Sequence, residues 1–246
     1  EVSLFSAPGR TEVSGNHTDH NHGRVIAAAV DLDAVAAASK NDEGIVRVKS
    51  RGYNIDTVEI TDLEVNSEDA GHSRSLVRGF LARFKELGYN IGGFDATTAS
   101  KVLSGSGLSS SAAFEVLVCT ILNHLYNDGK ISPVEIAKIS QYAENVHFKK
   151  PCGLLDQTAC AVGGFVTIDF ADPANPVIEK VPLDFEKTGH SLCIVDTKGS
   201  HSDLTGEYAA VRTEMEQVAA FFGKKVLREI SKKDVIENVG AISKAV

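Results

Sequence analysis

The chain has 246 residues, of which 43% are apolar and 24% charged, a composition typical of a globular protein with a substantial buried core. Its net charge of −8 argues against a nucleic-acid partner, because a phosphate-binding face is normally basic. No apolar run approaches the length of roughly 20 residues that a membrane-spanning helix needs, so we expect no membrane partner. The start of the sequence does not read as a signal peptide, and the cysteines form no C-x-x-C pair. We therefore expect a cytoplasmic protein. The sequence does not fix the oligomeric state, and a monomer is compatible with it.

Alternating and β-branched runs predict strands in the first sixty residues. They lie at residues 2–5, 24–30, 34–39, 45–48 and 55–60. Asp31 and Asp33 separate the second run from the third. We expect these strands to form an antiparallel sheet.

Helices and further strands follow in separate runs. Apolar residues at helical spacing predict helices over residues 73–87, 114–125 and 204–222, and another helix that begins at Pro133 and buries Ile136, Ile139, Ala143 and Val146. Strands are expected at residues 94–102, 165–170, 177–181 and 191–196. Because helices and strands do not alternate regularly, the pattern favours an α+β fold over a doubly wound sheet.

A Gly/Ser loop occupies residues 105–112, between an expected strand and an expected helix. Glycine lets the backbone approach a ligand closely, and the first N–H groups of a helix lack partners inside the helix. The segment therefore suits an anion, although an ordinary loop with a serine cap explains it as well. It is not a Walker A loop, because no Gly-Lys-Ser/Thr follows.

A dense polar segment runs from Gly9 to Gly23. A polyhydroxylated ligand needs such a density of groups, because each sugar hydroxyl both donates and accepts hydrogen bonds. Two alternatives remain open. One is a metal site built from His17, Asp19, His20 and His22, and the other is a solvated turn.

Asp156 lies in an otherwise apolar stretch, beside Leu154 and Leu155. A buried carboxylate is costly unless it is paired or functional. The alternative is an aspartate that caps the start of its own helix.

Taken in this order, the segments resemble the galactokinase family of the GHMP superfamily. Residues 9–23 are similar to its signature G-R-x-N-x-x-G-E-H-T-D-Y-N, and residues 105–112 to its nucleotide loop G-x-G-L-S-S-S-A. Ala143-Glu144-Asn145 followed by residues 152–157 resembles A-E-N … C-G-I-M-D-Q, and residues 207–212 resemble E-Y-x-x-V-R. Four ordered motifs over nearly the whole chain are far more specific than any one of them.

The resemblance implies a kinase that uses ATP and Mg²⁺ to phosphorylate D-galactose at its anomeric hydroxyl. Asp156 would be the general base, with Arg10 beside it. The implied sugar ligands are Asn16, His17, Thr18, Asp19, Gly153 and Tyr208. The implied nucleotide contacts are Ser50, Gly105, Ser106, Gly107, Leu108, Ser109, Ser110 and Ser111, and Ser111 and Glu144 would hold Mg²⁺. Tyr208 also lies on the apolar stripe of its helix, where packing alone could explain it.

The chain departs from the signature at several positions. Asn16 stands where the family has glutamate, Thr11 where it has asparagine, and His20 where it has tyrosine. An amide at residue 16 can still accept a hydrogen bond from a sugar hydroxyl and can also donate one. A kinase for a related sugar, such as N-acetylgalactosamine or arabinose, is therefore an alternative. A non-catalytic sugar sensor is another, although the presence of Arg10, Glu144 and Asp156 disfavours it.

The fold implied by the resemblance is the α+β GHMP kinase fold, with an N-terminal domain of the ribosomal-protein-S5-domain-2-like type that binds ATP and sugar. We expect this domain over residues 1–200 and the incomplete beginning of a C-terminal α+β domain over residues 201–246. The glycine-rich third motif of the family is absent from this sequence, which indicates a truncated chain.

Overall fold

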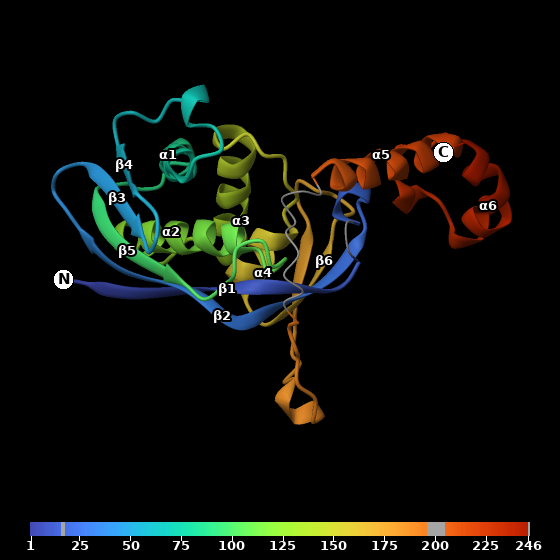
Figure 1. Cartoon of the computed structure of the whole chain (residues 1–246), viewed down its shortest axis with the longest axis horizontal. Coiled ribbons are helices and arrows are strands. Elements are labelled where there is room, and N and C mark those ends of the chain that lie inside the picture. The colour runs from blue at the N-terminus through green and yellow to red at the C-terminus, as the bar shows by residue number, and fades with distance from the viewer. Residues whose placement is uncertain (16–17, 196–204, 246) are drawn as a thin grey trace. The chain divides into compact units, whose positions relative to one another are not determined.

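The computed structural model of the protein describes residues 1–15, 18–195 and 205–245 (Figure 1). The chain divides into two compact units, each built from two separate stretches. Unit 1 consists of Glu1–Thr11 and Ala29–Gly164, and unit 2 of Glu12–Ala28 and Phe165–Val246. Strands β1 (Ser3–Ser14) and β2 (Arg24–Lys40) contribute to both units. The expected domain boundary at residue 200 lies outside the described residues.

The sheet of unit 1 is mixed, because the strand expected at residues 94–102 joins the strands of the first sixty residues and runs parallel to one of them. Its strands follow the order β4 (Ile55–Glu59), β3 (Ile45–Ser50), β5 (Phe94–Ser100) and β2. β3 runs antiparallel to β4 but parallel to β5, with Val46 opposite Phe94. A parallel pair needs a crossover, and here the chain makes it through β4 and a helix.

The two strands expected on either side of Asp31 and Asp33 form the single strand β2. Asp31 is exposed, and Asp33 is half-buried and accepts a hydrogen bond from Ser6 Oγ. Neither carboxylate is buried without a partner, so neither needs to interrupt the strand.

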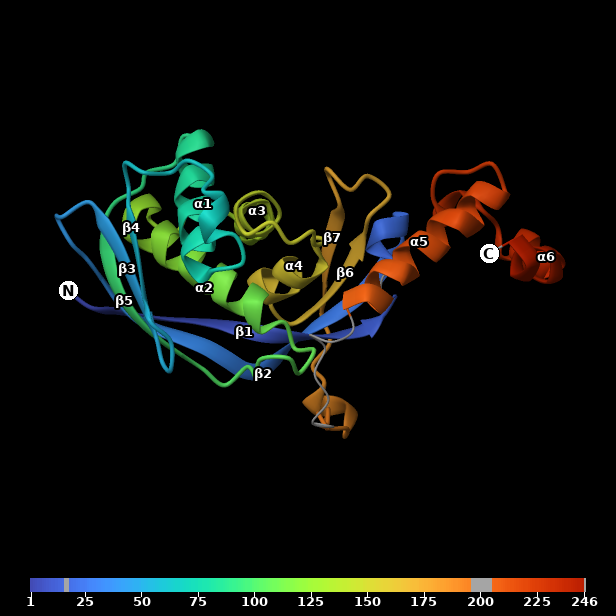
Figure 2. The same cartoon turned by 45° about the horizontal axis from the view of Figure 1, so that its top comes forward.

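Four helices cover one face of the unit 1 sheet (Figure 2). They are α1 (Ser73–Glu86), α2 (Ser110–Asn127), α3 (Pro133–Tyr142) and α4 (Leu155–Val162), and a short 3-10 turn, η2 (Ser67–Asp69), precedes α1. The large, fully buried side chains between helices and sheet are Phe80, Leu81, Phe84, Phe94, Leu117, Ile121, Leu122 and Ile139. This core fixes the ends of α2 and α4, where the candidate site lies.

The end of α3 passes into a π-helical turn, η3 (Ala143–His147). Such a turn holds one more residue than an α-helical turn and so changes which side chains face inwards. Glu144 and His147 are buried, whereas Val146, expected on the buried apolar face, is only half-buried. The turn therefore directs a carboxylate into the core.

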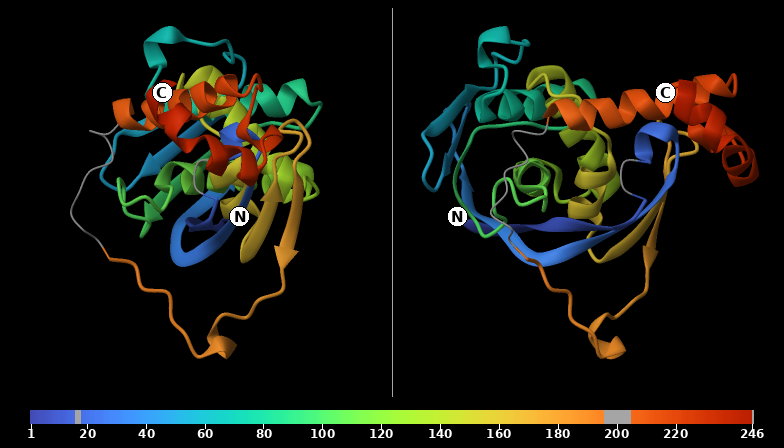
Figure 3. Two further views of the ribbon diagram at one scale, coloured as in Figure 1. Left: turned by 90° about the vertical axis from the view of Figure 1, so that its right-hand side faces the viewer. Right: turned by 45° about the vertical axis from the view of Figure 1, so that its right-hand side comes forward.

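In unit 2, the first part of β2 pairs antiparallel with β6 (Phe165–Asp169), and β6 pairs antiparallel with β7 (Val177–Val181). A 3-10 turn, η1 (Asp19–Asn21), lies between β1 and β2. After β7 comes an extended excursion with a second 3-10 turn, η4 (Glu186–Thr188), at its tip (Figure 3). The strand expected at residues 191–196 does not form over residues 191–195, which are irregular.

The helical part of unit 2 comprises α5 (Thr205–Phe221) and α6 (Lys232–Ala245), joined by a connection that contains a 3-10 turn, η6 (Leu227–Glu229). Within the described ranges, no helix combines the length and the apolar character that crossing a membrane requires.

Candidate active site

Arg10 and Asp156 form an ion pair within unit 1. Arg10 lies on β1, and Asp156 lies 146 residues later in the first turn of α4. Arg10 Nε donates to Asp156 Oδ1 at 2.8 Å. The arginine side chain is 9% exposed and the aspartate side chain 37% exposed, so the carboxylate remains accessible while its partner is fixed in the protein. Such charge-assisted hydrogen bonds are strong and orient the carboxylate.

Ser109 binds the other oxygen of the same carboxylate. Its Oγ donates to Asp156 Oδ2 at 2.5 Å. Ser109 immediately precedes α2 and has a left-handed backbone, with φ 56° and ψ 57°. For a residue other than glycine this conformation costs about 1–3 kcal/mol, and such strain is concentrated at functional sites. Both oxygens of Asp156 are thus held by donors.

The Gly/Ser loop contacts β1 directly. Arg10 Nη1 donates to Gly107 O at 2.5 Å, and Arg10 N donates to Leu108 O at 3.0 Å. A Cβ atom on Gly9 would lie only 2.9 Å from Leu108 O. On the loop itself, a Cβ on Gly105 would meet no atom within 4 Å, so its backbone is open to a ligand. Gly105 and Gly107 have φ 73° and 77°, which glycine adopts without strain.

Glu144 is the buried carboxylate of the π-helical turn. Its Oε1 lies 2.9 Å from Lys150 Nζ, and its Oε2 accepts from Gln157 Nε2 at 2.8 Å. Burial alone would lower the pKa of Lys150, but the charge of Glu144 and its hydrogen bond outweigh that effect and raise it. The side chain of Lys150 is 59% exposed, so it can leave Glu144 without disturbing the core.

Glu115 is a second buried carboxyl, which the sequence interpretation missed. Its Oε2 accepts from Gln157 Nε2 at 3.1 Å, and in the part of the chain that the structure describes, its Oε1 has no hydrogen-bond partner. Burial, and next the charge of Glu144, raise the pKa of Glu115 well above its usual value. The available signal was a single charge within the otherwise uncharged residues 110–123.

The loop before α4 contains Gly153 and is fixed by its neighbour Cys152. Cys152 N donates to Asn145 Oδ1 at 2.8 Å, and Asn145 Nδ2 donates to Cys152 O at 3.4 Å. Burial, together with the charge of Glu144, raises the pKa of the Cys152 thiol, so this cysteine is not a reactive thiolate.

The remaining expected contacts are distributed over both units. Ser50, on β3 in unit 1, accepts a hydrogen bond from Thr98 Oγ1 at 2.9 Å. Thr18 and Asp19 belong to unit 2, where Thr18 Oγ1 donates to Gly15 O at 2.7 Å and Asp19 Oδ1 accepts from the His20 backbone at 2.9 Å.

Three of the expected sugar ligands are described incompletely or not at all. Asn16 and His17 lie outside the described residues, and Tyr208 lies on α5. Within unit 1 the structure brings together Arg10, Asp156 and the Gly/Ser loop.

Two expected metal ligands, Ser111 and Glu144, lie in unit 1. Ser111 is exposed in the first turn of α2. Across residues 1–15, 18–195 and 205–245, no three His, Cys, Asp or Glu side chains are grouped as a metal site would require. The alternative histidine site cannot be assembled from these residues alone, because His17 lies outside them.

Two family models match the chain. Residues 75–164 match the GHMP kinases N-terminal domain, and residues 1–40 match the galactokinase galactose-binding signature. The first contains the Gly/Ser loop, Glu144 and Asp156, and the second contains Arg10 and the polar segment.

Similar proteins include galactokinases from two bacteria. The chain is 37% identical to the galactokinase of Streptomyces coelicolor, and the match covers 94% of this chain and 60% of the Streptomyces protein. It is 34% identical to that of Glaesserella parasuis, covering 96% of this chain and 60% of the relative. The chain thus spans about 60% of the length of these curated relatives.

Solved structures share the fold. Lactococcus lactis galactokinase complexed with galactose matches 97% of this chain and 62% of its own, with a TM-score of 0.78 and 24% identity. Methanococcus jannaschii mevalonate kinase matches 76% of this chain and 58% of its own, with a TM-score of 0.62 and 17% identity. The α+β fold is therefore that of the GHMP kinases.

Proposed function

Because the chain belongs to the galactokinase family of the GHMP kinases, we propose that the protein transfers the γ-phosphate of ATP to the anomeric hydroxyl of D-galactose, giving ADP and galactose 1-phosphate. The observation that carries this proposal is the accessible carboxylate of Asp156, which Arg10 and Ser109 hold from two sides next to an open glycine loop.

Asp156 is the proposed general base. A base for sugar phosphorylation needs a fixed, accessible oxygen that can take the proton of the attacking hydroxyl. Hydrogen bonds from Arg10 Nε and Ser109 Oγ fix both oxygens of Asp156, and the 37% exposure of its side chain leaves room for a substrate hydroxyl. Gly153 and the polar segment, including Thr18 and Asp19, supply the proposed sugar contacts.

The Gly/Ser loop and Glu144 fit ATP and Mg²⁺. The backbone at Gly105 is unobstructed, and the first turn of α2 follows at Ser110, so residues 105–111 would hold the phosphates. Ser111 and Glu144 provide the oxygen ligands that Mg²⁺ prefers and would hold the ion, with Ser50 as a further nucleotide contact. When bound, the metal supplies neutralisation of charge on the phosphate oxygens. Arg10 adds a fixed positive charge beside Asp156.

The test is a coupled assay of ADP release together with detection of the sugar phosphate. Asp156→Asn is expected to lower kcat roughly 10²–10⁴-fold, because it removes the base and keeps the shape of the side chain. Asp128→Asn is the matched control. It changes an exposed aspartate in the left-handed conformation that asparagine also tolerates, and it should leave kcat unchanged. Equal activity of the two variants would refute the role of Asp156.

A panel of sugars decides between galactose and its relatives. Asn16, in place of the family glutamate, is the reason to include N-acetylgalactosamine and arabinose. Turnover of one of these sugars without turnover of galactose would overturn the proposed substrate. Binding of ATP and galactose without release of ADP would instead identify a sugar sensor.

A further inference from the structure

Three side chains, which we call the loop clamp, connect the turn η1 and the residues after it to the segment between α5 and α6. They are Asn21 on η1, Asp169 on β6 and Arg228 on η6. All three belong to unit 2, so their contacts lie within one compact unit. Neither the proposed catalytic chemistry nor the expected sugar contacts account for them.

Asn21 is buried and uses both ends of its amide. Its Oδ1 accepts from the Leu227 backbone N–H at 3.1 Å, and its Nδ2 lies 2.9 Å from Met215 Sδ. A buried amide left without partners is unfavourable, so these contacts fix both the side chain and the turn that carries it. Leu227 begins η6 and Met215 lies on α5, so both partners come from the helical segment.

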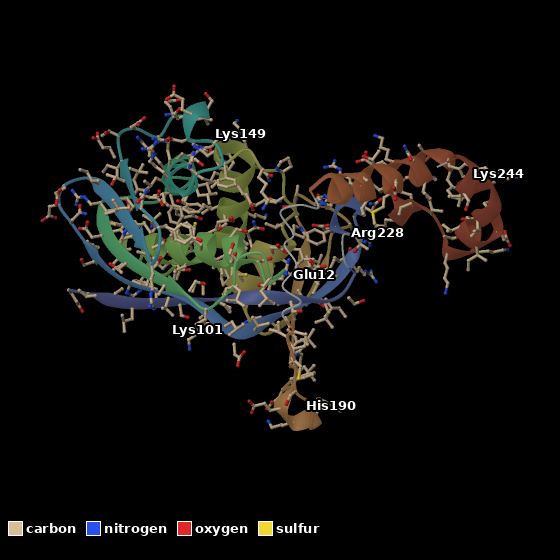
Figure 4. The ribbon with its side chains drawn as sticks, in the orientation of Figure 1. Glu12, Lys101, Lys149, His190, Arg228 and Lys244 are labelled. Carbon is tan, nitrogen blue, oxygen red and sulfur yellow. The ribbon has the colours of Figure 1, made fainter. Side chains whose placement is uncertain are left out.

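Arg228, which is labelled in Figure 4, contacts the backbone that follows Asn21. Its Nη1 donates to His22 O at 2.7 Å and to Asp169 Oδ1 at 2.6 Å, and its Nη2 donates to Asp169 Oδ2 at 3.2 Å. Arg24 Nε also donates to Asp169 Oδ2, at 2.7 Å. The bidentate contact between Arg228 and Asp169 fixes the plane of the guanidinium. The same guanidinium donates to His22 O, so it also fixes the position of that carbonyl.

The clamped backbone is the second half of the proposed sugar-binding loop. His22 has a left-handed backbone with φ 58°, and its N–H donates to Asp19 O at 3.1 Å. Gly23 N donates to Thr18 O at 2.7 Å. Because these bonds join His22 and Gly23 to Asp19 and Thr18, a displacement of the clamped end changes where the two proposed sugar ligands lie.

We propose that Asn21 and Arg228 are positioning residues for sugar binding, which hold residues 18–23 through the segment that connects α5 and α6. The inference rests on the proposed function for the identity of the ligand, but the clamp itself consists of contacts within unit 2. The side chains of Arg228 and Asp169 are only 33% and 21% exposed and are joined through both carboxylate oxygens, and all their contacts lie within unit 2, so we expect the effect of the pair to be local to that unit.

The test compares Arg228→Met with Arg83→Met in the purified protein. Arg83 is the matched control, because its side chain is 30% exposed and pairs with Glu86 on α1, in unit 1. In Arg228→Met, amide hydrogen exchange over residues 18–23, measured without sugar, should accelerate roughly tenfold. The KM for galactose should also rise roughly tenfold, while kcat and the KM for ATP stay within about twofold of the wild-type values. Arg228→Lys, which keeps one charged donor, should recover part of both effects.

Equal exchange of residues 18–23 in the two methionine variants would overturn the inference, whether or not the protein turns over galactose. So would a uniform change of kcat and both KM values, which indicates a general structural role. If Arg228→Met does not fold, the same comparison is made with Arg228→Lys, and unchanged exchange and KM in that variant would refute the clamp. A wild-type protein that does not phosphorylate galactose would refute the proposed function, while the exchange comparison still decides the inference.

Discussion

Glu115→Gln should stabilise the protein, and more strongly as the pH rises. Glu115 is fully buried, shares one amide donor with Glu144, and has no partner for its Oε1 among the described residues. Burial makes the largest contribution to raising its pKa, and the charge of Glu144 makes the next largest. The hydrogen bond from Gln157 and the charge of Lys150 lower the pKa, and the charge of Asp156 raises it slightly. Glutamine keeps the shape of the side chain and cannot ionise.

The size of the effect follows from proton linkage. Because the folded pKa of Glu115 lies above the unfolded one, the unfolded state loses its proton first as the pH rises. The wild type therefore loses up to about 1.4 kcal/mol of stability per pH unit between the unfolded and the folded pKa, and nothing further above the folded pKa. Well below the unfolded pKa, both states are protonated and the contribution vanishes. The advantage of Glu115→Gln should thus be smallest at acid pH, grow as the pH rises through the unfolded pKa, and level off only once the raised folded pKa is passed.

Urea unfolding followed by circular dichroism at a series of pH values measures this difference. The variants should share one m-value, so that the shift in midpoint reports stability. Glu59→Gln, on the exposed side of β4, is the matched control and is measured at the same pH values. A pH-independent difference for Glu115→Gln, or one that shrinks as the pH rises, would refute the argument from burial.

Three further substitutions test the packing, each by the free energy of unfolding in urea. Gly9→Ala should destabilise the protein by about 1–3 kcal/mol, because its Cβ would lie 2.9 Å from Leu108 O; a neutral result would mean that β1 and the Gly/Ser loop are not in tight contact. Gly240→Ala, inside α6 with no atom within 4 Å of the new Cβ, should instead stabilise it by about 0.5–1 kcal/mol, and a loss of stability would contradict the helical assignment. Phe80→Ala, fully buried on α1, should destabilise it by about 3–5 kcal/mol, and a loss below about 1 kcal/mol would show that the core is not packed around it.

Local patterns in the sequence predict most of the elements. The apolar spacing of α1 and the proline at the start of α3 place these helices to within a few residues, because amphipathic burial and the preference of proline for a first helical turn are local effects. β2 differs from its expectation because an exposed aspartate is tolerated within a strand. The parallel pairing of β3 with β5 could not be predicted, since strand order depends on contacts between residues far apart in the chain.

The candidate site is predictable only in part. Nothing in the sequence spacing brings Arg10 to Asp156 across 146 residues, and their pairing was expected only from the family resemblance. The hydrogen bond from Ser109 depends on a left-handed backbone that serine seldom adopts, so residue type did not predict it. Glu115 was missed because α2 is buried on nearly all sides, and a helix without a polar face gives no pattern that separates inward from outward residues.

The π-helical turn at Ala143–His147 limits how the length of this segment can vary. Successive residues of an α-helix are rotated by about 100°, so gaining or losing one residue here would turn Glu144 away from Gln157 and Lys150. Single-residue insertions and deletions should therefore be excluded from this short stretch in functional variants of the protein, while substitutions that keep the turn are accepted.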